Sequence, residues 1–257
     1  MQTILCIPGP WANQTELITA LVQARKGEYL FAGSILAHFP ADTHFLLEFY
    51  DADPELPTAF QRAGLFSAMS EEALAAVANH RTVAYLLTRP DQPVSIAGAR
   101  AVAQAAAALL DAGGVAVKVE TAGKAFEAAK WHELLASKGN ESLWELFVAV
   151  AIKAADGACF TCGMHNLGLK DALVRNLPTA DAIQVLREFT YFAVTEHPEL
   201  AVGHTFSLAA EAPIYHLAEV TPQPYADHPD FKNPFGMWEL RAKQPQQGAW
   251  NKWFSKN

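Results

Sequence analysis

The residues with the most suggestive chemistry are Cys159-Phe-Thr-Cys162, with His165 three positions further on. A redox pair with this spacing needs its first cysteine at the exposed N-terminus of a helix, where the helix dipole stabilises the thiolate. Here the pair lies in an apolar run that favours a strand, and residues three apart in a strand point to opposite faces. A zinc site needs four ligands, and no second CxxC or HxxxH motif completes one. We therefore favour two buried core cysteines over a redox or metal function.

Histidines supply a second candidate site. His204 and His216 lie in segments expected to form two strands that could pair, and His165 is expected in the same sheet. Three converging histidines would form a metal or acid–base site. For each one alone, a histidine satisfied by hydrogen bonds within the sheet is the favoured alternative. His132 is an isolated further candidate.

Glu120 is the carboxylate that we would test first. It ends a strand expected over 115–120 and is followed by a loop that contains Gly123. Catalytic and binding groups often follow the ends of strands. Lys118 alternates with Glu120 away from the neighbouring valines, so a solvated or salt-bridged pair is the alternative. We favour that alternative.

Composition and missing motifs exclude several classes of function. The 257 residues include 27 acidic and 19 basic ones, a net charge of −8, without the run of Lys or Arg that nucleic-acid binding favours. GxGxxG, GxxxxGK[ST], HExxH and GxSxG are absent. Three cysteines are too few for a disulfide framework. Because no leader or bilayer-spanning stretch is evident, we expect a cytoplasmic protein that binds neither membranes nor a cofactor.

The hydrophobic pattern predicts an α+β fold around a central hairpin. Residues 146–166 form two apolar runs joined at Asp156-Gly157, a dipeptide typical of hairpins because both turn residues need positive φ. Strands that are apolar at nearly every position are buried on both faces. Helices are expected to begin at N-cap residues, among them Asn13, Ser70 and Thr179. We therefore predict a mixed, mainly antiparallel sheet with helices packed on it.

The order of the expected elements indicates two similar halves and an arm. Residues 1–90 read as βαββαβ, the ferredoxin-like pattern, and residues 91–220 form a second α+β half packed on the first. Residues 221–257 form an arm rich in proline and aromatic residues, in which 237–240 is expected to add an edge strand. Three aromatic side chains near its end are expected to pack against the protein or a neighbouring subunit, or to form a binding patch: Trp250, Trp253 and Phe254.

Three short segments carry a resemblance to a known family: AVKVETAGKA at 116–125, TCGMHNLGL at 161–169 and NPFGMWEL at 233–240. They resemble a family of uncharacterised bacterial proteins, a domain of unknown function with a T-x-G-hydrophobic-x-x-hydrophobic-G segment before an edge strand. The matching positions here are Thr161, Gly163, Met164, Leu167 and Gly168. The resemblance implies a bacterial cytosolic α+β protein, and it carries over no catalytic residue.

Since the sequence completes no catalytic constellation, we favour a role in binding. The expected protein is a cytosolic bacterial accessory or immunity-type protein that recognises another protein, or a second copy of itself, through a sheet face or the aromatic tail. The alternative is a small-molecule enzyme with acid–base or metal groups in a cleft between the halves. Its candidate groups are Glu120, His165, His204 and His216.

Overall fold

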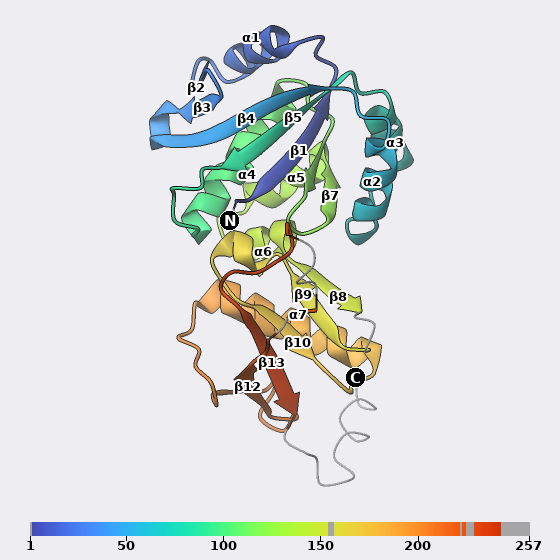
Figure 1. Cartoon of the computed structure of the whole chain (residues 1–257), viewed down its shortest axis with the longest axis vertical. Coiled ribbons are helices and arrows are strands. Elements are labelled where there is room, and N and C mark those ends of the chain that lie inside the picture. Colours follow the sequence, from blue (N-terminus) through green and yellow to red (C-terminus); the bar gives the residue numbers. More distant parts are fainter. Residues whose placement is uncertain (1, 154–156, 222, 225–228, 243–257) are drawn as a thin grey trace. The chain divides into compact units, whose positions relative to one another are not determined.

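The computed structural model describes residues 2–153, 157–221, 223–224 and 229–242 (Figure 1). The chain divides into two compact units, residues 1–147 and 148–257. Each unit is built on a sheet of its own. No helix among the described residues combines the length and the apolar character needed to cross a membrane.

The first unit contains a seven-stranded sheet. Its strands are β1 (Ile4–Gly9), β2 (Tyr29–Ala32), β3 (Ile35–His38), β4 (Thr43–Asp51), β5 (Thr82–Thr88), β6 (Ala116–Val119) and β7 (Lys124–Glu127). They run in the order β2-β3-β4-β5-β1-β6-β7, and every neighbouring pair is antiparallel. The register places Leu5 opposite Leu86 on one side and Val119 on the other. All three are fully buried, so β1 lies in the core of this unit.

Capping side chains fix where several helices of the first unit begin. The helices are α1 (Gln14–Ala24), α2 (Leu56–Ala63), α3 (Glu71–Ala78), α4 (Ile96–Asp111), α5 (Ala128–Ala136) and α6 (Glu141–Phe147). The Asn13 side chain accepts a hydrogen bond from the Glu16 amide, and Ser70 accepts one from the Ala73 amide. Both predicted N-caps are therefore confirmed, because the orphan amides of a first turn need such acceptors.

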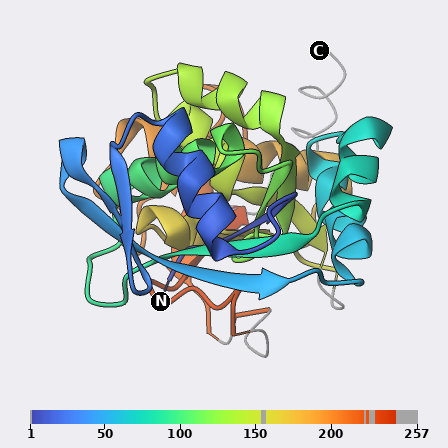
Figure 2. The same ribbon diagram turned by 90° about the horizontal axis from the view of Figure 1, so that it is seen from above.

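Helices cover both faces of this sheet. Ile7 lies near the last turn of α4, since its side chain and the Leu109 carbonyl both border Gly114. Cys6, the preceding residue in the strand, points to the other face. There it belongs to a buried cluster with Phe60 of α2 and Val77 of α3. Figure 2 shows the cyan pair α2 and α3 apart from dark-blue α1.

The second unit contains a six-stranded mixed sheet. Its strands are β8 (Ala149–Lys153), β9 (Cys159–Cys162), β10 (Asp171–Val174), β11 (Thr205–Phe206), β12 (Tyr215–Glu219) and β13 (Met237–Ala242). Their order is β11-β12-β13-β10-β9-β8, in which only the β10–β13 pair is parallel. A short 3-10 helix, η3 (Met164–Leu167), connects β9 to β10.

One long helix, α7 (Thr179–Glu196), packs on this sheet. Its buried residues Val185, Leu186 and Phe189 form a core cluster with Leu217 and Leu240 of the strands. The helix follows Pro178 directly, so Thr179 is its first residue rather than the predicted cap. On the opposite side of α7, residues such as Gln184, Glu188 and Tyr191 are exposed.

The predicted fold class is confirmed, because helices pack on two mainly antiparallel sheets. The predicted hairpin is confirmed as the antiparallel β8–β9 pair, with Gly157 at a φ of +83°. Asp156 of its turn lies outside the described residues. The hairpin's expected central place is wrong, because β8 lies at an edge of the second sheet. The duplicated ferredoxin-like layout is not established, because the two sheets differ in strand number and only the second contains a parallel pair.

The division of the chain differs from the predicted one. The units meet at residues 147 and 148 rather than near residue 90, because β6 and β7 join the first sheet beside β1. The predicted C-terminal arm supplies β13, which lies between β12 and β10 instead of at an edge. Met237 and Trp238, which point to opposite faces, are both buried, as expected for an interior strand.

Candidate functional site

Glu120 directly follows β6 and forms an ion pair with Lys118. Cys6 of β1 lies opposite both Lys118 and Tyr85 of β5 in the register, so the three share one face of the sheet. Burial, and then the Glu120 carboxylate, raise the pKa of the Cys6 thiol, and burial likewise raises the pKa of Tyr85. Both groups are therefore neutral near pH 7. Among the described neighbours of Glu120, this leaves no activated cysteine or tyrosine nucleophile.

His165 lies in η3, and 2% of its surface is exposed. Within the described residues, neither of its ring nitrogens has a hydrogen-bond partner. Burial lowers the pKa of His165 to about 4, so the imidazole is neutral at pH 7. The expectation that it lies in the sheet is wrong, because β9 ends at Cys162 and Gly163 turns the chain with a φ of +108°.

His204 and His216 lie on adjoining stretches of backbone. Thr205 of β11 pairs with His216 of β12, and the Leu217 amide donates to the His204 carbonyl at 2.8 Å. Both histidines are exposed. No group of three or more His, Cys, Asp or Glu side chains among the described residues could hold a metal ion. Two of the predicted histidines are thus neighbours, and the third belongs to a different element.

Cys159 and Cys162 are both buried. Cys159 is part of the cluster beneath α7. Burial, followed by the nearby Asp171 carboxylate, raises the pKa of the Cys162 thiol, which disfavours a reactive thiolate. These observations agree with core cysteines. The predicted binding residues Trp250, Trp253 and Phe254 lie outside the described residues.

A buried polar network, which the sequence did not reveal, is centred on Asp171. One carboxylate oxygen accepts hydrogen bonds from the Thr161 hydroxyl at 3.1 Å and the Met164 amide at 3.3 Å. The other accepts one from the Asn233 side-chain amide at 2.7 Å. A buried carboxylate needs such donors, so the network fastens β9, η3 and β10 to the loop before β13. Thr161 and Asn233 come from two of the segments from which a family resemblance was expected, and both donate hydrogen bonds to Asp171.

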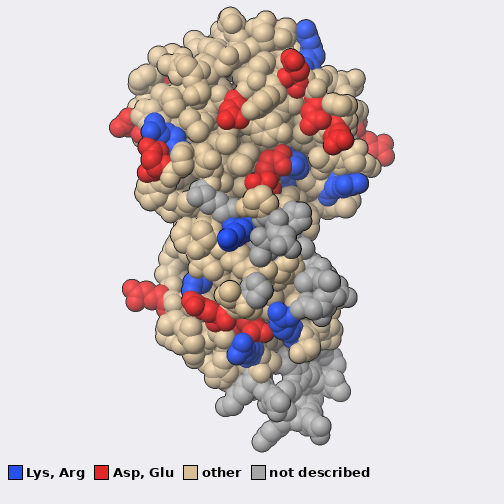
Figure 3. Space-filling model, in the orientation of Figure 1, with Lys and Arg blue, Asp and Glu red and all other residues tan. Residues whose placement is uncertain are grey.

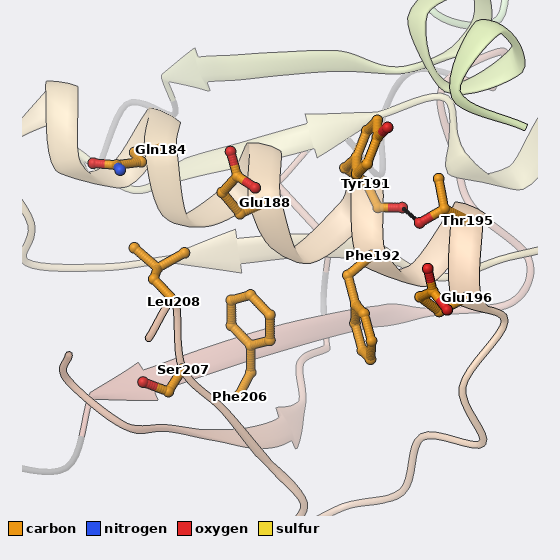
Figure 4. A pocket seen from close by; sticks show the side chains of 9 residues that line it. All are labelled: Gln184, Glu188, Tyr191, Phe192, Thr195, Glu196, Phe206, Ser207 and Leu208. Atoms are coloured by element: carbon orange, nitrogen blue, oxygen red, sulfur yellow. Dashed lines mark hydrogen bonds between the residues drawn. The ribbon is translucent and has the colours of Figure 1, made fainter. Parts of the chain in front are cut away.

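The outer side of α7 borders a hollow of about 400 Å³ (Figure 4). Residues of α7 form one wall. The other wall is formed by the last residue of β11, Phe206, and the two residues that follow it, Ser207 and Leu208. We call it the α7 hollow, and its lining includes Glu188, Tyr191, Phe192, Glu196, Phe206 and Leu208. The remaining lining side chains, labelled in Figure 4, are neutral and polar.

Helical spacing and core packing give the α7 hollow its shape. Glu188, Phe192 and Glu196 follow one another at intervals of four residues, so they form one stripe on the helix. Across from this stripe, Phe206 packs edge-to-face on Phe189, with 5.2 Å between the ring centroids, and lies 6.1 Å from Phe192. Phe189 is buried in the core, so its contact fixes the position of the Phe206 ring in the lining of the α7 hollow.

The α7 hollow is acidic. Among the described residues, its lining contains two carboxylates, Glu188 and Glu196, and no Lys, Arg or His. In the part of the chain that the structure describes, neither carboxylate has an ion-pair partner. Carboxylates beside aromatic faces attract cations and repel anions. The site is therefore suited to a positively charged group.

On the face seen in Figure 3, basic and acidic side chains of the described residues are interspersed. A continuous basic surface, which binding to a phosphate backbone requires, is not visible there.

Comparison of the chain with protein-family models, with curated proteins and with solved structures found no match. Function is therefore inferred from the side chains of this chain alone. None of the four residues of the enzyme hypothesis lines the α7 hollow.

Proposed function

We propose that this chain is a binding protein whose protein partner inserts a lysine or arginine side chain into the α7 hollow. The observation that carries the proposal is the pair Glu188 and Glu196, which flank aromatic rings in a lining whose described residues include no cation. The role is the bacterial cytosolic accessory or immunity-type role expected from the sequence. We assign it to α7 rather than to a sheet face or the aromatic tail.

A basic side chain complements both features of the hollow. Its methylene stem packs on Phe192 and Phe206, while its charged end reaches Glu188 or Glu196. A cation over an aromatic ring contributes about 0.5–1 kcal/mol at an exposed site, and an exposed ion pair contributes about as much or less. One inserted side chain therefore provides specificity, whereas affinity requires a wider contact.

The exposed side of α7 extends the contact surface. Ile183 and Tyr191 are 38% and 39% exposed, and they lie on a stripe next to the one that contains Glu188. Exposed aromatic and aliphatic side chains beside a pocket are typical anchors of interfaces. A stable complex buries at least about 1,000 Å², so the partner must cover α7 beyond the hollow itself.

An array of immobilised hexapeptides, varied one position at a time, tests the proposal. The wild-type chain should prefer peptides with Lys or Arg next to an apolar residue over the same peptides with Glu. The double variant Glu188→Gln, Glu196→Gln should bind the preferred peptides about tenfold more weakly, since about 1.4 kcal/mol of attraction is lost.

The matched control is the double variant Glu199→Gln, Asp230→Asn. It removes the same charge from exposed positions of the second unit outside the hollow and should leave binding unchanged. Equal weakening by both double variants would show that net charge, and not the hollow, attracts the peptides. A wild-type chain without preference for Lys or Arg would contradict the proposal outright.

A further inference from the structure

The first unit contains a hollow of its own, of about 410 Å³. Its walls come from the end of α1, from β2 and β3, and from α4 and α5. We call it the Arg25 hollow. Its polar lining consists of Arg25, Glu28, Tyr29, His38, Gln104 and His132, and alanine and leucine side chains complete it.

Asp111, at the end of α4, holds two of these side chains in place. One of its carboxylate oxygens lies 2.7 Å from Nη2 of Arg25, and the other lies 3.2 Å from Nε2 of His132. Asp111 does not line the hollow, whereas both of its partners do. Because each carboxylate oxygen has a partner, Asp111 orients the guanidinium and the imidazole in the way that an outer carboxylate orients a ligand histidine.

The strands β2 and β3 fix a second imidazole at the hollow. The His38 ring stacks on Tyr29 with 4.4 Å between the ring centroids and an angle of 14° between the ring planes. Burial raises the pKa of Tyr29 to about 12, although the nearby Arg25 charge opposes this shift. The Tyr29 hydroxyl therefore remains protonated at neutral pH.

The Nε atom of Arg25 keeps a hydrogen-bonding capacity that the described residues do not use. The atom is buried and has no partner among them. A guanidinium has five donors in a fixed planar arrangement, and Asp111 faces one of its nitrogens. Arg25 is also the C-cap residue of α1, where the helix dipole favours a positive charge. A cation that is paired with Asp111 and whose Nε has no partner among the described residues thus borders the hollow.

Charged side chains of both signs surround the hollow. Arg25 is positive, while Glu28 and Asp111 carry negative charges, Glu28 as an exposed side chain. His38 and His132 add two imidazole rings to the lining, and the N–H group of an imidazole can donate a hydrogen bond to an anion.

We propose that the Arg25 hollow binds a small anion with a carboxylate or phosphate group, held by Arg25, His38 and His132. Arginine presents the planar donor pair that matches such groups. The apolar wall formed by Ala107 and Leu135 accommodates a short hydrocarbon body. Since a bound anion and a protonated imidazole stabilise each other, we expect a bound anion to favour the protonated form of both rings.

A proton NMR titration of the full chain measures this coupling. The C2–H signals of the histidines are followed against pH with inorganic phosphate, with acetate, or with chloride alone, at one ionic strength. Either probe that binds should move the titration midpoints of His38 and His132 upward by about half a pH unit or more. The exposed histidines His197, His204 and His216 of the second unit serve as internal controls and should not move.

The two probes separate the two sources of the anion, because a response to phosphate alone assigns a phosphate group and a response to acetate alone a carboxylate. Unchanged midpoints with both probes would overturn the proposal. An equal movement of all histidines would also overturn it, because it would reflect nonspecific screening of the whole chain.

A pair of arginine variants tests whether the movement of the histidine midpoints arises from anion binding in the Arg25 hollow. Arg25→Gln should abolish the movement, whereas Arg62→Gln removes the same charge from an exposed position of α2 and should retain it. Arg25→Lys keeps the charge that balances Asp111 but loses the planar donor pair, so we expect about tenfold weaker binding. An unchanged anion response in folded Arg25→Gln would contradict the assignment. This site and the α7 hollow belong to different units, so each proposal stands or fails alone.

Discussion

Asp171 and His165 are close in the sequence of the second unit and both buried, yet their surroundings differ. Asp171 accepts hydrogen bonds from Thr161, Met164 and Asn233, whereas neither ring nitrogen of His165 has a partner among the described residues. A satisfied buried polar group helps to specify one structure. An unsatisfied one costs about 1–3 kcal/mol. The Asp171 side chain therefore stabilises the fold, whereas the unsatisfied His165 ring has a free-energy cost.

Removal of the Asp171 carboxylate should have the largest effect. Asp171→Ala leaves the Thr161, Met164 and Asn233 donors without this acceptor in a buried site, so the free energy of unfolding should fall by about 3–5 kcal/mol. Urea unfolding at pH 7, followed by circular dichroism, measures the loss. Asp230→Ala, at an exposed position, is the control and should change stability by less than about 0.5 kcal/mol. Similar losses of stability in Asp171→Ala and Asp230→Ala would show that the hydrogen bonds of Asp171 do not stabilise the fold.

Lowering the pH should reduce the free energy of unfolding, because the buried His165 ring resists protonation in the folded chain. Its pKa is about 4 in the folded chain, against an ordinary value of 6.5. Between these values the unfolded chain binds a proton that the folded chain does not, so stability falls as the pH is lowered from 6.5 to 4 and levels off below. The loss assigned to His165 is about 3 kcal/mol. Urea midpoints across this range, in wild type and in His165→Leu, isolate it, and parallel pH curves would contradict the prediction.

Asn233 should show an intermediate effect. Its side-chain amide donates to the Leu169 carbonyl at 2.9 Å and to Asp171, and its side-chain oxygen accepts from the Phe235 amide at 2.9 Å. Asn233→Ala removes these bonds but leaves Asp171 with two other donors, so we expect a loss of about 2 kcal/mol. The double variant with Asp171→Ala should lose clearly less than the sum of the single losses. Additive losses would show that the two side chains are not coupled.

The smallest effect should come from His165→Leu at pH 7. The substitution removes two unsatisfied nitrogens and keeps an apolar side chain in the space, so stability should stay within about 1 kcal/mol of wild type or rise. The same urea experiment provides the measurement. A loss of more than about 2 kcal/mol would show that the ring makes a favourable interaction in the folded protein.

Features that depend on neighbouring residues could be predicted from the sequence. The N-caps Asn13 and Ser70 and the β8–β9 hairpin each rest on contacts within a short stretch of chain. The ion pair of Glu120 with Lys118 is of the same kind, because residues two apart in a strand share a face.

Features that join distant segments could not be predicted. Asn233 and Asp171 are separated by 62 positions, and periodicity carries no information on such a pair. The same limit explains why β13 was expected at an edge, since its parallel partner β10 precedes it by a long stretch of chain. Both hollows combine a helix with strands or loops elsewhere, so their helical residues alone gave no signal of a site.

The interior place of β13 has a consequence for how the protein is made. Until residues 237–242 emerge from the ribosome, β11–β12 and β8–β9–β10 are two separate ribbons, each with an open edge. Unpaired strand edges are where nascent chains associate with one another. A shortened chain that ends before β13 would therefore leave the edges of β12 and β10 unpaired, and such edges favour aggregation. Residues 237–242 are better understood as the closing strand of the sheet than as a dispensable tail.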